Sequence, residues 1–270
     1  MNHKFFLLAC FFPLLTLAQT EDSIRISRLL KIDTVGTTRA ERLSFFSKKF
    51  IDTPYQAGTL EGKKTEELVI CSGAVDCTTF VEQALALALA DSTYTSFKEK
   101  LQQIRYKDGD IKGYASRLHY ISMWIEENSS KQILKEITSL FPHKIRTQSL
   151  QFMSRNAHLY PALKDSPEMK KAIREAETAY QNYHYPYIPK EWLQRPEIET
   201  LLPEGSIVAF VSNKSDLDTV HIGFIIYKNG KPHLLHASQR HKKVLIDPLS
   251  LYEYTSRRKD VIGIRIITLR

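Results

Sequence analysis

The stretch VDCTTFVEQALALALAD, residues 75–91, places one cysteine directly after an aspartate and at the start of an apolar, alanine-rich run. The spacing predicts a buried helix that begins at Cys77, because one helix face carries Phe80, Val81, Ala84, Leu85, Ala88 and Leu89. The thiol could be a core residue, since free cysteine is often buried. It could instead pair with Cys71 in a disulfide, or act as a nucleophile whose thiolate is favoured by the helix N-terminus, which lowers its pKa.

The length of 270 residues and a hydrophobic content of 43% allow a sizeable core, and we expect one domain over residues 20–270. Residues 1–19 have the layout of a secretory signal peptide, with Lys4, an apolar run and small or polar residues after it. We therefore expect an exported protein, periplasmic or secreted. Cys10 lies in the motif LLAC and is a candidate for lipid acylation. No later apolar stretch predicts a transmembrane helix.

The net charge of +8 favours anionic partners in general. Lysine and arginine are scattered, and the longest basic clusters are short, at residues 241–243 and 257–259. No recognisable nucleic-acid module accompanies them, so the sequence favours carboxylate-bearing substrates over nucleic acid. We expect no cofactor.

Two periodicities divide the chain. The first third predicts helices from Ser23, Thr37 and Ser96, and Thr38 with Glu41 has the spacing of a capping box. From Gly205 onward short apolar runs alternate with a period of two, which predicts an antiparallel sheet and an α+β fold. Residues 106–196 are interpreted as an insertion that shapes the substrate groove, with a helix capped by Ser166 and with Pro167 at its first position.

A hairpin in the predicted sheet brings two histidines together. Asn229-Gly230 is a strong signal for a tight turn between two strands. Counting outward from this turn, Gly223 lies opposite His236, and His221 lies diagonal to His236 on the same face; the earlier pairs are Tyr227 with Pro232 and Ile225 with Leu234.

A helix N-terminus placed against that face would assemble a cysteine hydrolase. Cys77 would be the nucleophile, His221 the general base, and His236 the residue that orients His221. The backbone N–H of Cys77 would hold the oxyanion. The same three side chains could bind zinc, but no closely spaced CxxC or HxxxH pair supports a metal site, and we expect none.

Four segments in order resemble the NlpC-type papain-like cell-wall hydrolases: DTPYQAG (52–58), VDCTTFVEQAL (75–85), LPEGSIVAFV (202–211) and HIGFIIYKNGKPHLLHAS (221–238). The TTFVE after the cysteine and the stretch GYASRLHYISMWI (113–125) are most similar to a larger N-acetylmuramoyl-L-alanine amidase-like family. The resemblance implies a papain-like core, with Cys77 at a helix N-terminus packed on a C-terminal antiparallel sheet. It maps nucleophile, base and third polar residue to Cys77, His221 and His236.

The implied reaction cleaves the amide between N-acetylmuramic acid and the L-alanine of the stem peptide, in peptidoglycan or muropeptides, through a thioester. An endopeptidase cutting the γ-D-glutamyl to diaminopimelate bond is the alternative enzyme. A non-catalytic wall-binding module and an acyltransferase are further alternatives.

The resemblance also suggests residues around the nucleophile. Tyr55 falls on the tyrosine that such enzymes place beside the cysteine, and we expect Asp76 and Thr78 at the substrate-binding surface. Arg117 could pair with a stem-peptide carboxylate through its planar guanidinium. Polar or stacking contacts could come from Ser116, His119 and Tyr120. Alternatively, the aromatic residues of this stretch pack in the core while Arg117 faces solvent.

Overall fold

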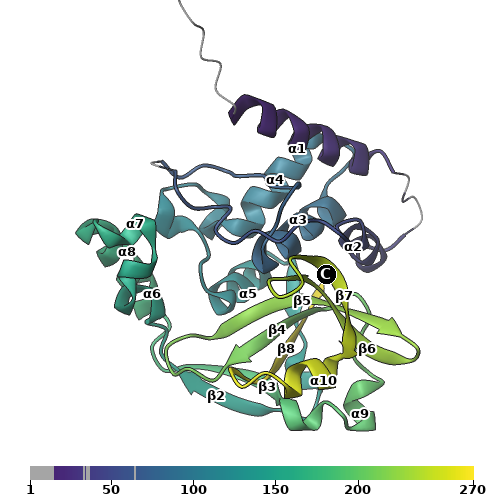
Figure 1. The fold of residues 1–270 in the computed structure, drawn as a ribbon. Coiled ribbons are helices and arrows are strands. Elements are labelled where there is room, and N and C mark those ends of the chain that lie inside the picture. Colours follow the sequence, from purple (N-terminus) through teal and green to yellow (C-terminus); the bar gives the residue numbers. More distant parts are fainter. Residues whose placement is uncertain (1–14, 33, 35–36, 64) are drawn as a thin grey trace, which may run out of the picture.

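The computed structural model describes residues 15–32, 34, 37–63 and 65–270. Helices pack against an eight-stranded sheet whose neighbouring strands are all antiparallel, which confirms the predicted α+β class (Figure 1). Cys10 and most of the predicted leader lie outside the described residues. Helix α1 begins at Leu15, so the backbone is helical from well before Ser23, the predicted start.

Helices α1 to α5 form a layer on one side of the sheet, α6, α7 and α8 group together beside it, and α9 and α10 lie on the opposite side (Figure 1). None of the helices in the described ranges is both long and apolar enough to cross a membrane. The helices are α1 (Leu15–Leu30), α2 (Arg39–Lys48), α3 (Cys77–Leu89), α4 (Tyr94–Arg105), α5 (Ile121–Ser130), α6 (Phe152–Arg155), α7 (Pro161–Lys164), α8 (Pro167–Thr178), α9 (Pro196–Glu199) and α10 (Leu251–Ser256).

The sheet has the strand order β2-β3-β8-β4-β5-β6-β7, and β1 also pairs with β8. The central strand pairs join segments that are distant in the chain, since β8 lies between β3 and β4. The strands are β1 (Leu134–Glu136), β2 (Lys144–Gln148), β3 (Tyr183–Pro189), β4 (Ile207–Ser212), β5 (Thr219–Lys228), β6 (Lys231–Ser238), β7 (Lys243–Ser250) and β8 (Val261–Leu269).

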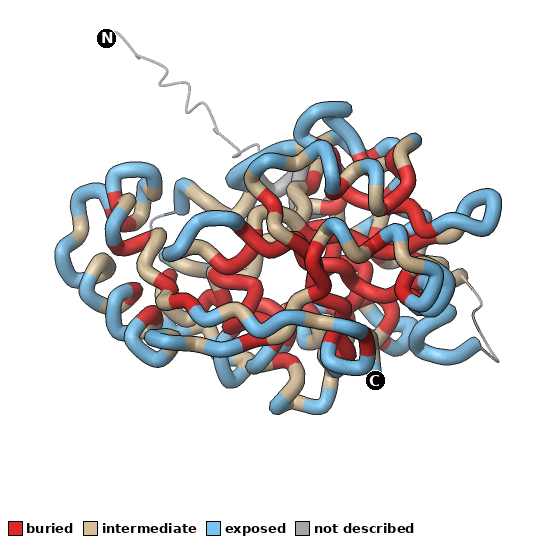
Figure 2. Tube along the Cα trace, turned by 90° about the horizontal axis from the view of Figure 1, so that it is seen from below, coloured by how far each residue is buried: buried red, intermediate tan, exposed pale blue. Residues whose placement is uncertain are grey.

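Both faces of the sheet are buried. Along β4, Ile207 and Ala209 belong to the core shared with the helical layer, whereas Val208 and Phe210 belong to a second core beneath α9 and α10. This alternation follows from the strand period of two. Buried residues are accordingly concentrated in the middle of the molecule, with exposed segments around them (Figure 2).

Helix α3 begins at Cys77 as predicted, and every residue from Thr79 to Ala88 is buried. A helix that is apolar on all sides must lie inside the protein, and α3 packs against α2, α4, β5 and β6. Phe80 makes an edge-to-face contact with Phe224 of β5, with ring centroids 5.3 Å apart. This packing fixes the amino end of α3 against the sheet.

Local signals in the sequence are confirmed at three places. Thr38 and Glu41 form the capping box of α2, and Ser166 caps α8 with Pro167 in the first turn. Asn229 and Gly230 have positive φ angles of 53° and 75°, the backbone that a tight hairpin turn requires. The β5–β6 register pairs Tyr227 with Pro232 and Ile225 with Leu234, as counted from the turn.

The expectation of a sheet built only from the C-terminal part is wrong. Strands β1, β2 and β3 come from the segment 106–196 that was interpreted as an insertion, and β1 and β3 pair with β8. Their sequences carry little alternation, because β1 is short and β2 is mostly exposed. Strand β2 pairs with β3, and the pairing of β1 and β3 with the rest of the sheet depends on β8, which follows far later in the chain.

A stability prediction follows from Gly223 in β5. A Cβ atom at this position would lie 2.7 Å from the carbonyl oxygen of Leu235 and 2.8 Å from Cδ1 of Leu234. Gly223→Ala should therefore lower the free energy of unfolding by about 1 to 3 kcal/mol, as overpacking does in a well-packed interior.

Gly73→Ala is the matched control, because no atom lies within 4 Å of its added Cβ. Urea denaturation of both variants measures the difference. Equal stability of the two variants would contradict the close approach of β6 at Gly223.

Candidate active site

A cavity of about 490 Å³ lies where α3 meets the sheet. Four of the predicted site residues line it: Tyr55 from the loop before α3, Cys77 from α3, His221 from β5 and His236 from β6. Its volume is in the range of small-molecule sites. The fold thus brings together residues that lie far apart in the chain.

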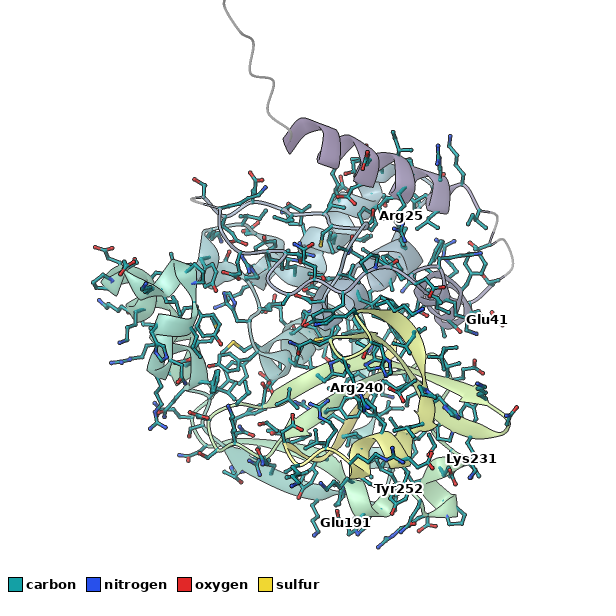
Figure 3. The ribbon with its side chains drawn as sticks, in the orientation of Figure 1. Arg25, Glu41, Glu191, Lys231, Arg240 and Tyr252 are labelled. Atoms are coloured by element: carbon teal, nitrogen blue, oxygen red, sulfur yellow. The ribbon has the colours of Figure 1, made fainter. Side chains whose placement is uncertain are left out.

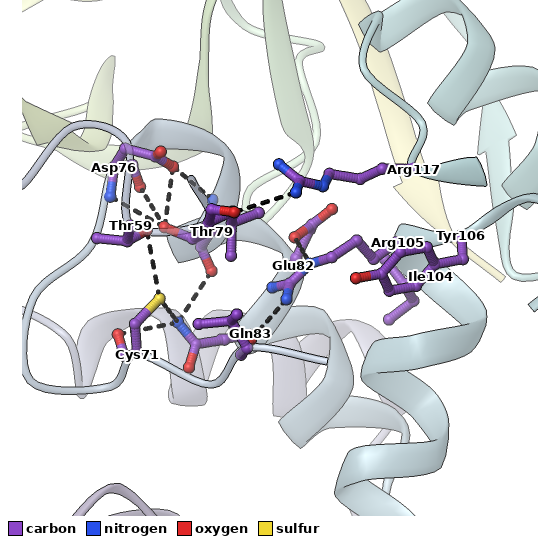
Figure 4. A network of polar contacts seen from close by, with 12 residues as sticks. Thr59, Cys71, Asp76, Thr79, Glu82, Gln83, Ile104, Arg105, Tyr106 and Arg117 are labelled. Atoms are coloured by element: carbon purple, nitrogen blue, oxygen red, sulfur yellow. Dashed lines mark hydrogen bonds and ion pairs between the residues drawn. The ribbon is translucent and has the colours of Figure 1, made fainter. Parts of the chain in front are cut away.

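Cys77 occupies the first turn of α3, and the helix is capped by Asp76. The Asp76 carboxylate accepts hydrogen bonds from Thr79 N at 2.8 Å and from Thr79 Oγ1 at 2.9 Å. Figure 4 shows that these contacts stay within the first turn of the helix. Asp76 does not line the cavity, so the structure supports capping rather than the predicted substrate contact. Thr78 Oγ1 lies 4.0 Å from Cys77 Sγ.

The two histidines are directly hydrogen-bonded. Nε2 of His221 lies 2.7 Å from Nδ1 of His236, and the rings meet edge to face. On the far side, Nε2 of His236 lies 3.4 Å from Oδ2 of Asp247. This distance is long for a hydrogen bond, so the contact is chiefly electrostatic. His236 and Asp247 are 2% and 4% exposed, respectively.

The histidine pair is enclosed by aromatic rings. Tyr254 lies 5.3 Å from His236 and 6.3 Å from His221, measured between ring centroids. Phe210 also packs against His221, with the ring centroids 5.7 Å apart. These contacts restrict the orientation of both imidazole rings.

Burial shifts the pKa values of Cys77 and His221 toward their neutral forms. Burial, assisted by Asp76, raises the pKa of the Cys77 thiol to about 12, and nearby hydrogen-bond donors such as Thr78 only partly oppose this. Burial and His236 lower the pKa of His221 well below its ordinary value. The predicted lowering of the cysteine pKa is therefore wrong, because desolvation of the thiolate outweighs the helix N-terminus.

Four of the other predicted binding residues line a second cavity, of about 430 Å³, beside α8: Ser116, Arg117, His119 and Tyr120. Arg117 is buried there and bonds to Glu66 through Nε and Nη2, at 3.0 and 2.7 Å, and to Glu61 through Nη1 at 2.8 Å. The predicted alternative in which Arg117 faces solvent is therefore wrong. Since two carboxylates of the chain already hold this guanidinium, its contacts favour a structural role.

The neighbours of Arg117 also bond within the chain. Ser116 Oγ donates to the carbonyl of Gly113 at 2.7 Å, and His119 Nε2 lies 2.8 Å from the carbonyl of Tyr114. Tyr120 donates to the buried carboxylate of Glu177 at 2.6 Å. The two cavities share no lining residue: of the predicted binding residues, Tyr55 lies in the first, the four from Ser116 to Tyr120 in the second, and Asp76 and Thr78 in neither.

The structure does not join Cys77 to Cys71, although Cys77 also packs against the main core. Cys71 and Cys77 are both free thiols. Cys71 faces Thr59 and Gln83 in the network beside α3 (Figure 4). In the described part of the chain, no group of three or more His, Cys, Asp or Glu side chains is placed to hold a metal ion.

Residues 45–264 match the model of the AmiA-like family, described as N-acetylmuramoyl-L-alanine amidase-like. The chain belongs to this family. A comparison with curated proteins found no match.

Solved structures agree on the fold. An N-acetylmuramoyl-L-alanine amidase from Bacteroides uniformis is 34% identical, with a TM-score of 0.81, and the match covers 85% of this chain and 99% of that one. A protein from Bacteroides fragilis, provisionally named a xylanase, is 40% identical, with a TM-score of 0.78 and coverages of 83% and 98%. A Legionella pneumophila protein shares the fold at 23% identity, with a TM-score of 0.75 and coverages of 94% and 96%.

Sequence reasoning missed Asp247. The residue lies in KVLIDP, a run interpreted only as a strand, and its contact with His236 depends on how β7 pairs with β6. The register shifts between His233 and Leu235, so counting along the strands does not give this contact. An acidic residue within an apolar strand was the one available signal.

Asp247→Ala should lower the free energy of unfolding by about 1 to 3 kcal/mol, because the buried His236 ring loses its electrostatic contact with the Asp247 carboxylate, 3.4 Å away. Burial raises the pKa of Asp247, but His236 and the backbone N–H of Leu249 outweigh it and lower the pKa. The stabilisation is therefore present above the ordinary aspartate pKa and is lost as pH falls through the lowered value. Denaturation at neutral and acid pH should show a smaller difference in acid.

Asp110→Ala is the control, since Asp110 forms an exposed ion pair with Lys112 and should contribute less than about 1 kcal/mol. ¹⁵N NMR of the His236 ring should show a single tautomer in the wild type and a mixture in Asp247→Ala. An unchanged His236 tautomer together with unchanged stability would contradict the contact.

The raised pKa of Cys77 predicts slow alkylation at neutral pH. In a chain that begins at residue 20 and carries Cys71→Ala, Cys77 is the only thiol. Its rate of reaction with iodoacetamide should still rise at about pH 10, because the thiolate is the reactive form. A plateau reached near neutral pH would show a resting thiolate and contradict this prediction.

Proposed function

We propose that the protein is a cysteine amidohydrolase that cleaves the amide between N-acetylmuramic acid and L-alanine of a peptidoglycan stem peptide. The observation that carries this proposal is the single cavity lined by Cys77, His221 and His236, with the two rings 2.7 Å apart, in a member of an amidase-like family. The order of cysteine helix and histidine strands also supports an NlpC-type papain-like core. The leader at residues 1–19 would deliver the enzyme to the periplasm or the exterior.

Acylation starts from a neutral thiol and a neutral imidazole. Nε2 of His221 is bonded to His236, which leaves Nδ1 to accept the thiol proton. The sulfur attacks the carbonyl carbon of the lactyl amide, and the C–N bond breaks as His221 returns the proton to the departing amine. The products of this half-reaction are a thioester on Cys77 and a peptide with a free L-alanine amino group.

Deacylation uses the same groups. A water molecule gives a proton to His221 while its oxygen attacks the thioester carbon, and the sulfur leaves and regains the proton. N-acetylmuramic acid is released with a free carboxyl group. The backbone N–H of Cys77, at an α3 terminus where such groups have no helical acceptor, is suited to bind the oxyanion in both steps.

His236 and Asp247 act through His221. With Nε2–H of His236 directed at Asp247, Nδ1 of His236 is free to accept the Nε2–H of His221. This tautomer leaves a lone pair on Nδ1 of His221, where the base is needed. The imidazolium that forms is stabilised through the pair by the Asp247 carboxylate.

The cavity does not suit the polysaccharide hydrolysis implied by the name of the Bacteroides fragilis relative. Glycosidases generally use two carboxyl groups that flank the scissile bond. Among the described residues that line this cavity, Asp247 is the single carboxylate, and it faces His236. The lining therefore favours cysteine chemistry over glycoside cleavage.

Cys77→Ala should abolish the release of stem peptide from purified muropeptides, whereas Cys71→Ala should retain it. Mass spectrometry identifies the bond, since the proposed reaction yields an intact peptide and a peptide-free sugar. Fragments cut within the peptide would instead indicate the endopeptidase. Unchanged release by a folded Cys77→Ala variant would refute the cysteine mechanism, and wall binding without any cleavage would support the binding module.

A further inference from the structure

The cavity that contains Cys77 is also lined by three arginines. Arg240 comes from the turn between β6 and β7, and Arg257 and Arg258 follow α10. Arg240 is labelled in Figure 3. Against these cations, the described lining residues provide the carboxylate of Asp247 alone, which is directed at His236. The cavity therefore has an excess of positive charge.

Arg258 is already neutralised within the chain. Its Nε and Nη2 donate to the two carboxylate oxygens of Asp260 at 2.7 and 2.5 Å, and Nη1 donates to the hydroxyl of Tyr254 at 2.9 Å. This bidentate pair fixes the guanidinium as part of the cavity wall. Arg258 positions Tyr254, which packs against both histidines.

Arg240 and Arg257 differ from Arg258. Both are exposed, and no carboxylate in the described ranges lies within ion-pair distance of either guanidinium. Glu253 interacts with Arg257 only through its electric field, because the Glu253 carboxylate accepts the hydrogen bonds of Ser250 that cap α10. Two guanidinium groups at the cavity thus remain available to a ligand.

We propose that Arg240 and Arg257 form a carboxylate subsite that selects substrates by an anionic group on the peptide side of the scissile amide. The inference rests on the proposed amidase function. Before cleavage the lactyl group is part of a neutral amide, so the muramoyl side carries no charge, whereas the peptide carries free carboxylates. Guanidinium matches the planar geometry of a carboxylate, and an exposed pair also attracts anions from solution.

The carboxylate could be the C-terminal group of the peptide or the side chain of an acidic residue within it. A dipeptide ending in D-glutamate carries both kinds, and either can be capped as an amide. The test therefore uses N-acetylmuramoyl-L-alanyl-D-glutamate with both carboxyls free, with the α-carboxyl amidated, with the γ-carboxyl amidated, and with both amidated.

Kinetics of Arg240→Gln, Arg257→Gln and the double variant are compared with the wild type at low and high salt. The double variant should raise KM for the free diacid about 10-fold and leave kcat unchanged, because the arginines bind the substrate without touching the reacting atoms. It should also lose the salt dependence of KM and the preference for the diacid over the diamide. Arg174→Gln on α8 is the control, since Arg174 is exposed and lies outside this cavity.

Each outcome decides the proposal. The amide that abolishes the difference between wild type and double variant identifies which carboxylate is bound. Equal KM values for diacid and diamide in the wild type, or an unchanged KM in the double variant, would overturn the subsite. If the wild type cleaves none of the four compounds, the amidase proposal fails instead. Calorimetric binding of the same compounds to Cys77→Ala, with and without the arginine substitutions, then tests the subsite without turnover.

Discussion

The burial of α3 is the constraint on which the site depends. A helix rich in alanine and leucine on every side reaches a low free energy only when other elements cover it completely. A charged residue of this helix also needs a partner inside the protein, and buried Glu82 pairs with Arg105 at 2.7 Å. Helix α3 is held between α2, α4 and the sheet. This packing fixes the position of its first turn relative to β5 and β6. Cys77 is therefore positioned by a helix and not by a loop.

The same burial determines the chemistry of the site. Desolvation favours uncharged groups, so it raises the pKa of the thiol and lowers that of His221, and in the proposed reaction charge develops on them only when substrate is attacked. In that reaction, the Asp247 carboxylate beside His236 would stabilise the positive charge of an imidazolium. In the proposed reaction, a neutral thiol depends on His221 to remove its proton before the sulfur can attack.

The arginines that line the cavity of Cys77 differ in whether a carboxylate of the chain neutralises them. Arg258 is fixed by Asp260, as Arg117 is fixed by Glu61 and Glu66 beside α8. The exposed guanidinium groups of Arg240 and Arg257 have no carboxylate partner in the described part of the chain. An arginine in a sequence motif is therefore a poor guide to ligand binding, because the carboxylates that neutralise it come from other segments.

The sequence by itself determined the features set by neighbours a few residues apart. The start of α3 at Cys77, the caps at Thr38 and Ser166, and the Asn229-Gly230 turn follow from local hydrogen bonds and backbone angles. The register counted from that turn also placed His221 diagonal to His236, since strand geometry is regular over so short a distance.

Only the tertiary structure decided the features that depend on distant segments. Strands β1 and β3 obtain their partner from β8, Asp247 reaches His236 through a shifted register, and Arg117 lies in a second cavity apart from Cys77. The direction of the Cys77 pKa shift belongs to the same group. Desolvation is a property of everything packed around an atom, and no window of the sequence contains it.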